Sequence, residues 1–396
     1  MFKSLKRMVY QVSDAEKAGK WYKEILGKDP AFDSPIAVIF KIGDSSLSLV
    51  KGPDGLPADS GRLAAYWEVD DVDQSLGRLL EMGATEKSPP GNVLNIRTAQ
   101  AVDPFGIVIG LTGGISEDGM RTIENRPSET AHNVALCRAL ASFDARFGAR
   151  TSDPFSGIFL KENVKPVLRD ETTRRSVIDT MISRPLYGYF IARSAFIDET
   201  FVRALRNRIP QIVFMGAGYD TRALRFENLL GTTRIFELDA PTTQNRKKEC
   251  LEKTGTRVPR QVSFISVNFK NENFLEKLED AGFTRSAATL FIWEGVTYYL
   301  PEEAIDRTLE LIREVSAPKT GLCFDYMTSK LDSINMGEPF LSWINPERIQ
   351  EYLEKFGFRL MDHPDAGEIG ARYLNLSNGI QAEKPLPSLR LAYAEK

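Results

Sequence analysis

A glycine-rich turn at residues 216–222, with the sequence GAGYDTR, combines the residue types best suited to bind a small ligand. The apolar residues 211–215 (QIVFM) before it are typical of a buried strand, and the residues after it (ALRF) are typical of a helix start. Gly216 and Gly218 let a ligand approach the backbone closely, and the unpaired N–H groups of a helix start attract polar atoms. The turn therefore predicts a site for a nucleotide or a nucleoside.

The turn lacks the features of two common nucleotide-binding motifs. Thr221 stands where a dinucleotide-binding turn has its third glycine, and the Lys-Ser or Lys-Thr ending of a phosphate-binding loop is absent. The expected ligand is therefore a nucleoside with one small charged arm and no pyrophosphate.

Two carboxylates follow the turn at the distance that a ribose requires. Glu237 and Asp239 end the next apolar segment, residues 234–239 (RIFELD), and lie about 20 residues beyond the glycines, where an acidic group accepts hydrogen bonds from ribose hydroxyls. S-adenosyl-L-methionine (SAM) fits both features. The alternative is that these carboxylates cap the helix expected from Pro241.

Three motifs carry a resemblance to a known family. GAGYDTRALRF, FELDAPTTQNRK and FIWEGVTYYLPEEAI occur in this order between about Ser128 and Tyr373, a region that resembles the leucine carboxyl methyltransferase family. The likeness is greatest to its bacterial branch of O-methyltransferases that act on polyketides and other small molecules. It implies a class I Rossmann-like α/β sheet, SAM as the cofactor, and a small-molecule acceptor.

The resemblance also implies which residues bind SAM. Two arginines lie near the methionyl carboxylate, the turn passes beneath the methionine part, strand-end acids take the ribose hydroxyls, an Asn-Phe pair reads adenine, and one more acid lies beside the cofactor. In this order, the residues are Arg138 and Arg193; Gly216, Ala217, Gly218 and Asp220; Glu237 and Asp239; Asn268 and Phe269; and Glu294. Asn268 departs from the family pattern, which has Asp, but an amide oxygen still accepts from the adenine amino group.

The chemistry of methyl transfer leaves the catalytic residue open. Displacement at a sulfonium needs positioning and exclusion of water more than it needs reactive groups. A carboxylate acceptor requires no base, whereas a hydroxyl acceptor benefits from one. Glu294, Tyr326 and His132 are the candidate bases, and the sequence does not choose among them.

The elements that must position these residues alternate between strands and helices, which predicts a parallel sheet with covered faces. Strands are expected at residues 211–215, 234–239, 262–267, 289–293 and 321–326, and helices at about 243–253, 272–281 and 301–315. A helical region from residue 128, interrupted at residues 153–155 and continuing over 174–206, is expected to cover the mouth of the site. The tail after Lys384 contains prolines and is expected to be loosely held.

The first 113 residues contain an internal repeat. Asp14 and Asp71 each precede a helical segment, and Gly27 and Gly83 each follow one, as expected for helix caps. A strand before each helix and further strands after it give the order βαβββ twice. The motifs VSDAEKAGKWYKEILG and VDPFGIVIGL resemble the glyoxalase, bleomycin-resistance and dioxygenase superfamily, which is also called vicinal oxygen chelate and pairs such modules round a cavity.

Metal-dependent members of that superfamily place His, Gln or Glu at four strand positions that face the cavity. The corresponding positions here fall near Arg7, Ser48, Ala64 and Gly110, which do not form a ligand set for a divalent metal. We therefore predict a metal-free N-terminal domain that binds a ligand, presents a substrate, forms a dimer or has a purely structural role.

Composition excludes several partners. The chain has 51 basic and 54 acidic residues and a net charge of −3, whereas a nucleic-acid surface needs concentrated Lys and Arg. Apolar runs are too short to cross a membrane, and no signal peptide is visible. Cys137, Cys250 and Cys323 are widely separated, which is typical of a reduced, cytoplasmic setting.

These patterns predict an N-terminal domain at residues 1–113, a glycine-rich linker at 114–127 and a methyltransferase domain at 128–396. The first functional hypothesis is a SAM-dependent O-methyltransferase acting on a small-molecule hydroxyl or carboxyl group, in secondary metabolism. The second is a resistance-type protein that binds or sequesters a small molecule in the N-terminal cavity. A homodimer through the N-terminal domain is expected from the second resemblance.

Overall fold

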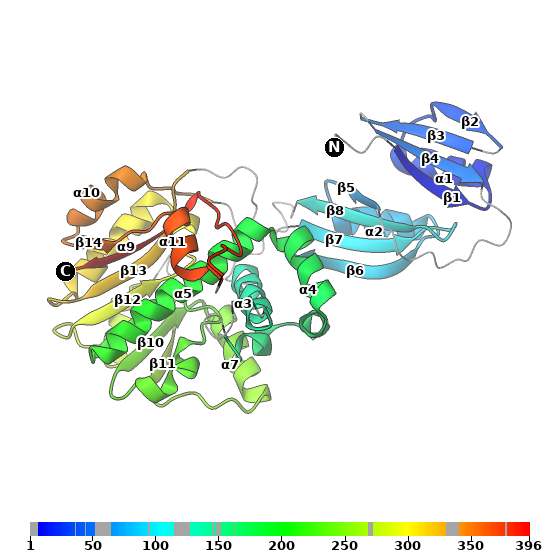
Figure 1. Cartoon of the computed structure of the whole chain (residues 1–396). Coiled ribbons are helices and arrows are strands. Elements are labelled where there is room, and N and C mark those ends of the chain that lie inside the picture. Colours follow the sequence, from blue (N-terminus) through cyan, green and yellow to red (C-terminus); the bar gives the residue numbers. More distant parts are fainter. Residues whose placement is uncertain are drawn as a thin grey trace. The chain divides into compact units, whose positions relative to one another are not determined.

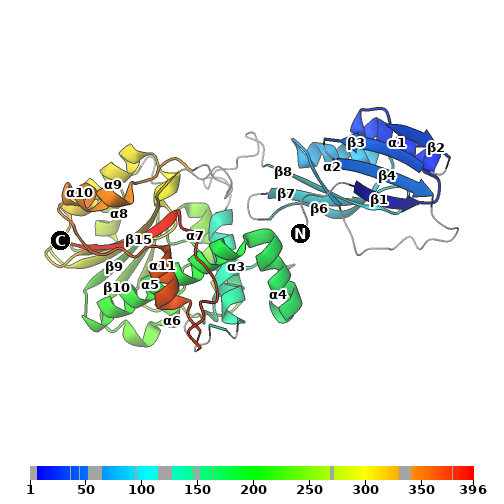
Figure 2. The same cartoon turned by 45° about the horizontal axis from the view of Figure 1, so that its top comes forward.

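The computed structural model describes residues 7–35, 37–43, 45–51, 65–93, 96–114, 127–144, 146–147, 152–162, 164–267, 272–329, 340–376 and 378–396. The chain divides into two compact units, residues 1–119 and residues 120–396, which are shown in Figures 1 and 2. The predicted linker at 114–127 falls almost wholly outside the described residues. In the described part of the chain, none of the helices combines the length and the apolar character needed to cross a bilayer.

The N-terminal unit confirms the βαβββ repeat. The first module consists of β1 (Arg7–Val12), α1 (Ala15–Leu26), β2 (Phe32–Ser34), β3 (Ala37–Ile42) and β4 (Ser45–Lys51). The second consists of β5 (Ala65–Glu68), α2 (Val72–Glu81), β6 (Thr85–Val93), β7 (Ile96–Val102) and β8 (Val108–Gly114). Their sheets have equivalent strand orders, β1-β4-β3-β2 and β5-β8-β7-β6.

The predicted helix caps are confirmed. The Asp14 carboxylate accepts the Lys17 N–H at 3.0 Å, and the Asp71 carboxylate accepts the Gln74 N–H at 2.9 Å. Gly27 closes α1 with φ +61°, a left-handed conformation that a residue without Cβ adopts at little cost. Local sequence signals therefore set both ends of α1 and the start of α2.

The sequence analysis did not locate β2 and β6. β6 contains two prolines and a glycine at residues 89–91, and its pairing with β7 shifts register around them. Because β6 is an edge strand, one of its sides pairs with no other strand. Proline, which lacks an N–H, is therefore tolerated in it. The strand is therefore compatible with residues that otherwise signal a turn.

A polar contact joins the two modules within their shared core. The Tyr22 hydroxyl on α1 donates to Asp103 at 2.9 Å, and the same carboxylate accepts the N–H groups of Phe105 and Ile107. Both Tyr22 and Asp103 are buried. The Asp-Pro-Phe-Gly turn of the second module therefore fixes the helix of the first.

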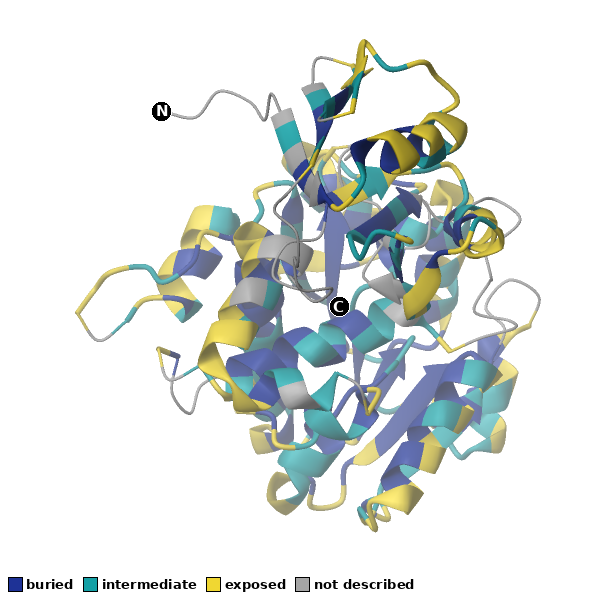
Figure 3. Cartoon of the chain, turned by 90° about the vertical axis from the view of Figure 1, so that its right-hand side faces the viewer, coloured by how far each residue is buried: buried dark blue, intermediate teal, exposed yellow. Residues whose placement is uncertain are grey.

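The C-terminal unit is an α/β domain whose central sheet has the order β11-β10-β9-β12-β13-β15-β14. Its strands are β9 (Gln211–Met215), β10 (Arg234–Asp239), β11 (Val262–Ser266), β12 (Thr289–Trp293), β13 (Gly321–Met327), β14 (Arg359–Asp362) and β15 (Leu389–Glu395). The pairs β11-β10, β10-β9, β9-β12 and β12-β13 are parallel, and Figure 3 shows the central strands buried. The predicted Rossmann-like sheet is confirmed.

Helices and short helical turns complete the unit. Before the sheet come α3 (Glu129–Ser142), η3 (Ser156–Phe159), η4 (Lys165–Arg169), α4 (Glu171–Val177), the π-helical turn η5 (Ile178–Ile182) and α5 (Arg184–Arg206). Within the sheet region come α6 (Arg222–Arg225), η6 (Glu227–Leu229), α7 (Pro241–Lys253), α8 (Phe274–Asp280), η7 (Thr297–Tyr299), α9 (Glu302–Glu314), η8 (Pro346–Arg348), α10 (Ile349–Glu354) and α11 (Ala366–Tyr373).

The helical run predicted over residues 174–206 is wrong in one respect, because it is broken at Ser183. This residue has φ +74°, which is outside the helical range, and Pro185 follows as the second residue of α5. Proline suits the first turn of a helix but not its interior, so a new helix begins there.

The expectation of a loosely held tail after Lys384 is also wrong. β15 lies between β13 and β14, antiparallel to both, and Leu389, Leu391, Ala392 and Ala394 are buried. The prolines at 385 and 387 precede the strand and do not interrupt it. The apolar residues after these prolines form a strand, because the position between β13 and β14 buries their side chains.

Candidate functional site

The glycine-rich turn follows β9 directly and requires glycine at two positions. Gly216 has φ +77°, and a Cβ added there would lie 2.7 Å from Cγ2 of Val296. Gly218 has φ +50°, and its Cβ would lie 3.1 Å from Cβ of Ala131 on α3. Side chains from α3 and from the segment after β12 therefore flank a backbone turn that itself remains partly exposed.

The turn is tied to β10. The N–H groups of Gly216 and Ala217 both donate to the Leu238 carbonyl at 2.9 Å. The Asp239 carboxylate accepts the Gly218 N–H and, at 2.6 Å, the Ala240 N–H. Burial raises the pKa of Asp239 to about 6, although both N–H groups favour its charged form. The acid that the sequence placed about 20 residues beyond the glycines therefore faces the turn.

Glu237 lies in the interior and pairs with a residue that the sequence analysis missed. Its Oε2 lies 2.5 Å from Nζ of Lys247 on α7, and both side chains are buried. Burial raises the pKa of Glu237 to about 7 despite the charge of Lys247. Lys247 reaches β10 only because α7 folds back against that strand, so no local motif announced the pair.

This pair gives an expected pH dependence of stability. An unfolded glutamate titrates near pH 4.3, so between about pH 4.3 and 7 the folded protein keeps a proton that the unfolded chain releases. This bound proton stabilises the folded protein at low pH. The free energy of unfolding therefore falls as pH rises from about 4.3 to about 7, where the proton is lost. Urea unfolding from pH 4.5 to 8 should show stability falling more steeply in wild type than in the double variant Glu237→Gln/Lys247→Met. A difference between the two proteins that stays constant with pH would contradict the assignment.

Arg193 and Glu294 lie together at the end of β12. Nε of Arg193 lies 3.0 Å from Oε1 of Glu294, and Nη1 donates to Asp325 on β13 at 2.8 Å. The Asp325 carboxylate also accepts the Gly295 N–H at 2.6 Å and the Tyr189 hydroxyl at 3.0 Å. Arg193 is therefore a buried side chain with two carboxylate partners and not a solvated helix charge.

Arg138 is buried on α3 beside the same turn. One Nη donates to the Tyr219 carbonyl, and Nε lies 3.2 Å from Oδ2 of Asp153. This side chain, too, is not a solvated helix charge. The structure brings Arg138, Arg193, the glycine turn, Asp239 and Glu294 to one end of the parallel strands, where ligands of such sheets bind.

These arginines belong to a continuous chain of ion pairs among four arginines and five carboxylates. Successive contacts link Arg138, Asp153, Arg225, Asp198, Arg222, Glu294, Arg193 and Asp325, and Asp220 also contacts Arg222. Sequence reasoning missed Arg222, Arg225, Asp153, Asp198 and Asp325, since only the adjacent charges of the DTR motif hinted at any of them.

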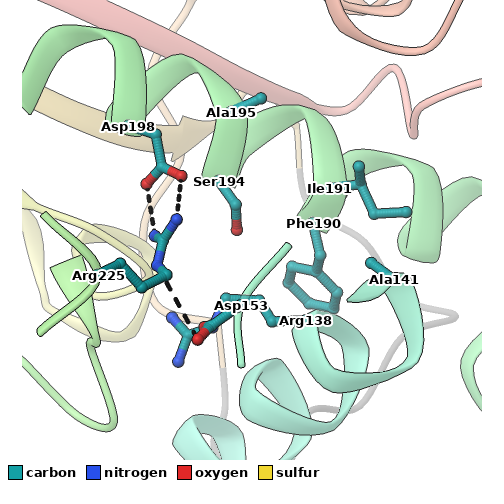
Figure 4. Close-up of a pocket in the computed structure, with 9 residues that line it drawn as sticks. All are labelled: Arg138, Ala141, Asp153, Phe190, Ile191, Ser194, Ala195, Asp198 and Arg225. Carbon is teal, nitrogen blue, oxygen red and sulfur yellow. Dashed lines mark hydrogen bonds and ion pairs between the residues drawn. The ribbon is translucent and has the colours of Figure 1, made fainter. Parts of the chain in front are cut away.

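A small cavity of about 20 Å³ lies between α3 and α5 along this chain (Figure 4). Arg138, Asp153, Asp198 and Arg225 contribute to its wall, and the bidentate Asp198–Arg225 pair is visible there. A more open groove of about 410 Å³ borders the outer side of the same pair. Neither space is lined by the glycine turn or Asp239, so we locate the cofactor site from the turn and the acids.

The three candidate bases lie in settings that make them weak proton acceptors near neutral pH. Burial alone would raise the pKa of Glu294, but Arg222, Arg193 and Arg138 lower it to about 2. Burial lowers the pKa of His132 to about 4. The Tyr326 hydroxyl lies 2.6 Å from Nε2 of His363, and burial raises the pKa of Tyr326 far above its usual value.

Some predicted site residues are not described. Asn268 and Phe269 lie outside the described residues, although β11 ends just before them beside the Asp239 strand. In the N-terminal unit, the Arg7 side chain and Ala64 are likewise outside the described residues. Ser48 is buried, and the Tyr66 ring covers Gly110 so closely that a Cβ added there would lie 2.6 Å from it. Across the described ranges, no three His, Cys, Asp or Glu side chains form a group that could hold a metal ion.

Two family profiles match the chain. That of "Leucine carboxyl methyltransferase" covers residues 131–313, and that of the "Glyoxalase/Bleomycin resistance protein/Dioxygenase superfamily" covers residues 4–111. Among solved structures, the chain is similar to the antibiotic-binding protein TnmS3 from Streptomyces (33% identity, 28% of this chain and 97% of that chain, TM-score 0.25). It is also similar to the SAM-dependent methyltransferase SibL (11% identity, 57% of this chain and 61% of that chain, TM-score 0.34).

Curated relatives match about a third to a half of the chain. A protein from Mycolicibacterium smegmatis, assigned by inference as a SAM-dependent methyltransferase, is 32% identical over 219 residues, which cover 54% of this chain and 72% of the relative. A relative from Mycobacteroides abscessus with the same assignment is 33% identical over 150 residues, 37% of this chain and about half (49%) of that protein. With the turn, the strand-end acids and the sheet order, these matches show that the chain belongs to the leucine carboxyl methyltransferase family of SAM-dependent methyltransferases.

Proposed function

We propose that the protein transfers the methyl group of SAM to a hydroxyl or carboxyl oxygen of a small molecule, in secondary metabolism. SAM supplies an electrophilic methyl group on a sulfonium. The observation that carries the cofactor placement is the sheet order β11-β10-β9-β12, in which neighbouring strands end about 4.8 Å apart. The residues proposed to contact adenine, ribose, the methionine part and the amino-acid end follow one another along this edge. The same parts follow one another in this order within SAM.

The residue roles follow from this order. Asn268 and Phe269 after β11 contact adenine, Asp239 with Glu237 behind it serves the ribose, and the backbone of Gly216–Asp220 supports the methionine part. Arg138, Arg193 and Glu294 serve the charged amino-acid end, where guanidinium groups pair with a carboxylate and a carboxylate pairs with an ammonium. Asp239 supports this assignment because its carboxylate already lies against the turn.

The settings of the candidate bases favour an acceptor that is ionised when it binds. Glu294 is held as a weakly basic carboxylate by its arginine neighbours, Tyr326 is buried, and His132 is half-buried. An acceptor carboxylate or an acidic phenol needs no proton removed by the protein. The residues proposed to bind SAM then act by orienting the cofactor and by excluding water from the methyl transfer.

A transfer assay tests the proposal. Isotope-labelled SAM is incubated with the full chain and a panel of small carboxylic acids, phenols and aliphatic alcohols, and label is measured in the acceptor. We expect label in the carboxylates or phenols, and at least a tenfold weaker SAM affinity by calorimetry in Asp239→Asn, which keeps the shape but loses the charge that accepts two donors. Glu279→Gln, which changes an exposed carboxylate, is the matched control and should leave both readouts unchanged.

The result that contradicts the proposal is a wild-type protein that binds no SAM, or one that binds it equally well after Asp239→Asn. Binding without transfer to any oxygen acceptor would contradict the O-methyltransferase assignment alone.

The second hypothesis from the sequence, a resistance-type binding protein, is supported only by the N-terminal unit. There the half-exposed Tyr66 ring lies over Gly110 and its hydroxyl accepts from Gln100 at 2.6 Å, which leaves a flat aromatic surface on the sheet. A cytoplasmic location and a homodimer through this unit remain predictions.

A further inference from the structure

Arg222 connects the glycine turn with two other elements of the C-terminal unit. It is the first residue of α6, and its side chain is fully buried. Nε donates to Asp198 on α5 at 2.7 Å, while Nη1 contacts Asp220 in the turn and donates to Glu294 at 2.7 Å. The Arg222 N–H also donates to Asp220 at 2.7 Å. One guanidinium therefore fixes the positions of the turn, α5 and the end of β12 relative to one another.

The Glu294 carboxylate is held from both sides. Oε2 accepts from Arg222, whereas Oε1 lies 3.0 Å from Nε of Arg193, so the two arginines share one carboxylate. Glu294 keeps 12% of its side chain exposed, whereas Arg222 has 0% and Arg193 2%. Glu294 is thus the most exposed of these three groups, and Arg222 lies wholly behind it.

We propose that Arg222 is a positioning residue for the amino-acid end of SAM, acting through Glu294 and, through that carboxylate, on Arg193. This inference rests on the proposed function, because it takes Glu294 and Arg193 as the contacts of that end. Arg222 has no direct contact with the cofactor in this arrangement. A planar guanidinium reaches Asp198, Asp220 and Glu294 at once with fixed angles, whereas a lysine ammonium is a point charge that does not fix their relative positions.

The test compares two ligands that differ only in the part concerned. S-adenosylhomocysteine has the amino-acid end, and 5′-methylthioadenosine has the same adenosine but lacks that end. For Arg222→Lys we expect the Kd of S-adenosylhomocysteine to rise at least tenfold while the Kd of methylthioadenosine stays within twofold of wild type. A merely structural role would weaken both ligands alike, because a displaced turn also moves Asp239, which accepts the Gly218 N–H and serves the ribose that both ligands share.

Arg225→Lys is the matched control. Arg225 lies on the same short helix and shares Asp198, but its other polar contacts are with Thr221 and Asp153. We expect both ligands to bind Arg225→Lys within twofold of wild type. Because Arg222 is fully buried, replacing it risks misfolding, so Asp198→Asn serves as a second probe. Asp198 is 16% exposed, and its replacement removes the negative charge that orients Nε of Arg222.

For Asp198→Asn we expect at least a threefold selective loss for S-adenosylhomocysteine. Equal weakening of both ligands by folded Arg222→Lys or by Asp198→Asn overturns the inference, as does unchanged binding of both. If the wild-type protein binds neither S-adenosylhomocysteine nor SAM, the proposed function itself fails. If wild type binds them and only the selectivity is missing, the role given to Arg222 fails alone.

Discussion

Replacing Gly216 by alanine is expected to lower SAM affinity at least tenfold and to destabilise the C-terminal unit. Gly216 has φ +77°, and a Cβ there lies 2.7 Å from Cγ2 of Val296, so either the turn or the Val296 side chain must shift. A left-handed conformation costs an L-residue about 1–2 kcal/mol, and the close contact adds to this. Calorimetry with SAM and urea unfolding measure the two effects.

Gly231→Ala separates strain from contact. Gly231 also has a left-handed conformation, with φ +52°, but a Cβ added there meets nothing within 4 Å. Both variants therefore carry a similar backbone cost, and only Gly216→Ala displaces Val296. SAM affinity that falls equally in both variants would show that general destabilisation, and not the shape of the turn, is responsible.

Replacing Asp325 by leucine is expected to lower the free energy of unfolding by about 3–5 kcal/mol, the range found when one partner of a buried ion pair is removed. Asp325 has 0% exposure and accepts from Arg193, Tyr189 and the Gly295 N–H. Its loss leaves the Arg193 charge with Glu294 as its remaining carboxylate and removes the acceptor of the Tyr189 and Tyr298 hydroxyls and of the Gly295 N–H. Urea unfolding, followed by far-ultraviolet circular dichroism, measures the change.

Two variants make this prediction specific. Glu171→Gln removes an exposed ion pair with Arg175, whose side chains are 65% and 68% exposed, and should change stability by about 0.5 kcal/mol or less. The double variant Arg193→Met/Asp325→Leu should recover part of the loss, because it leaves no unpaired charge in the interior. A single variant as stable as Glu171→Gln would mean that the buried network does not hold the unit together.

The N-terminal unit illustrates how much of a fold sequence patterns can predict. Its caps, its repeat and the order of its elements along the chain follow from local preferences and from apolar alternation that a reader of the sequence can find. What was missed there, β6, is an edge strand with prolines, in which the local signal favours a turn and the neighbouring strand decides the pairing.

By itself the sequence determined the two αβ units, the glycine turn, and the carboxylate that faces it, because these depend on periodicity and on residues within one strand, turn and helix. Only the tertiary structure decided the charge partners. Arg193 and Asp325 are 132 positions apart, Arg222 and Glu294 are 72 apart, and no pattern along the chain relates them. Burial removes water from these side chains, so each charge pairs with whichever opposite charge the fold brings within reach. The same long-range requirement placed β15 inside the sheet, because its two pairing partners, β13 and β14, come from other parts of the chain.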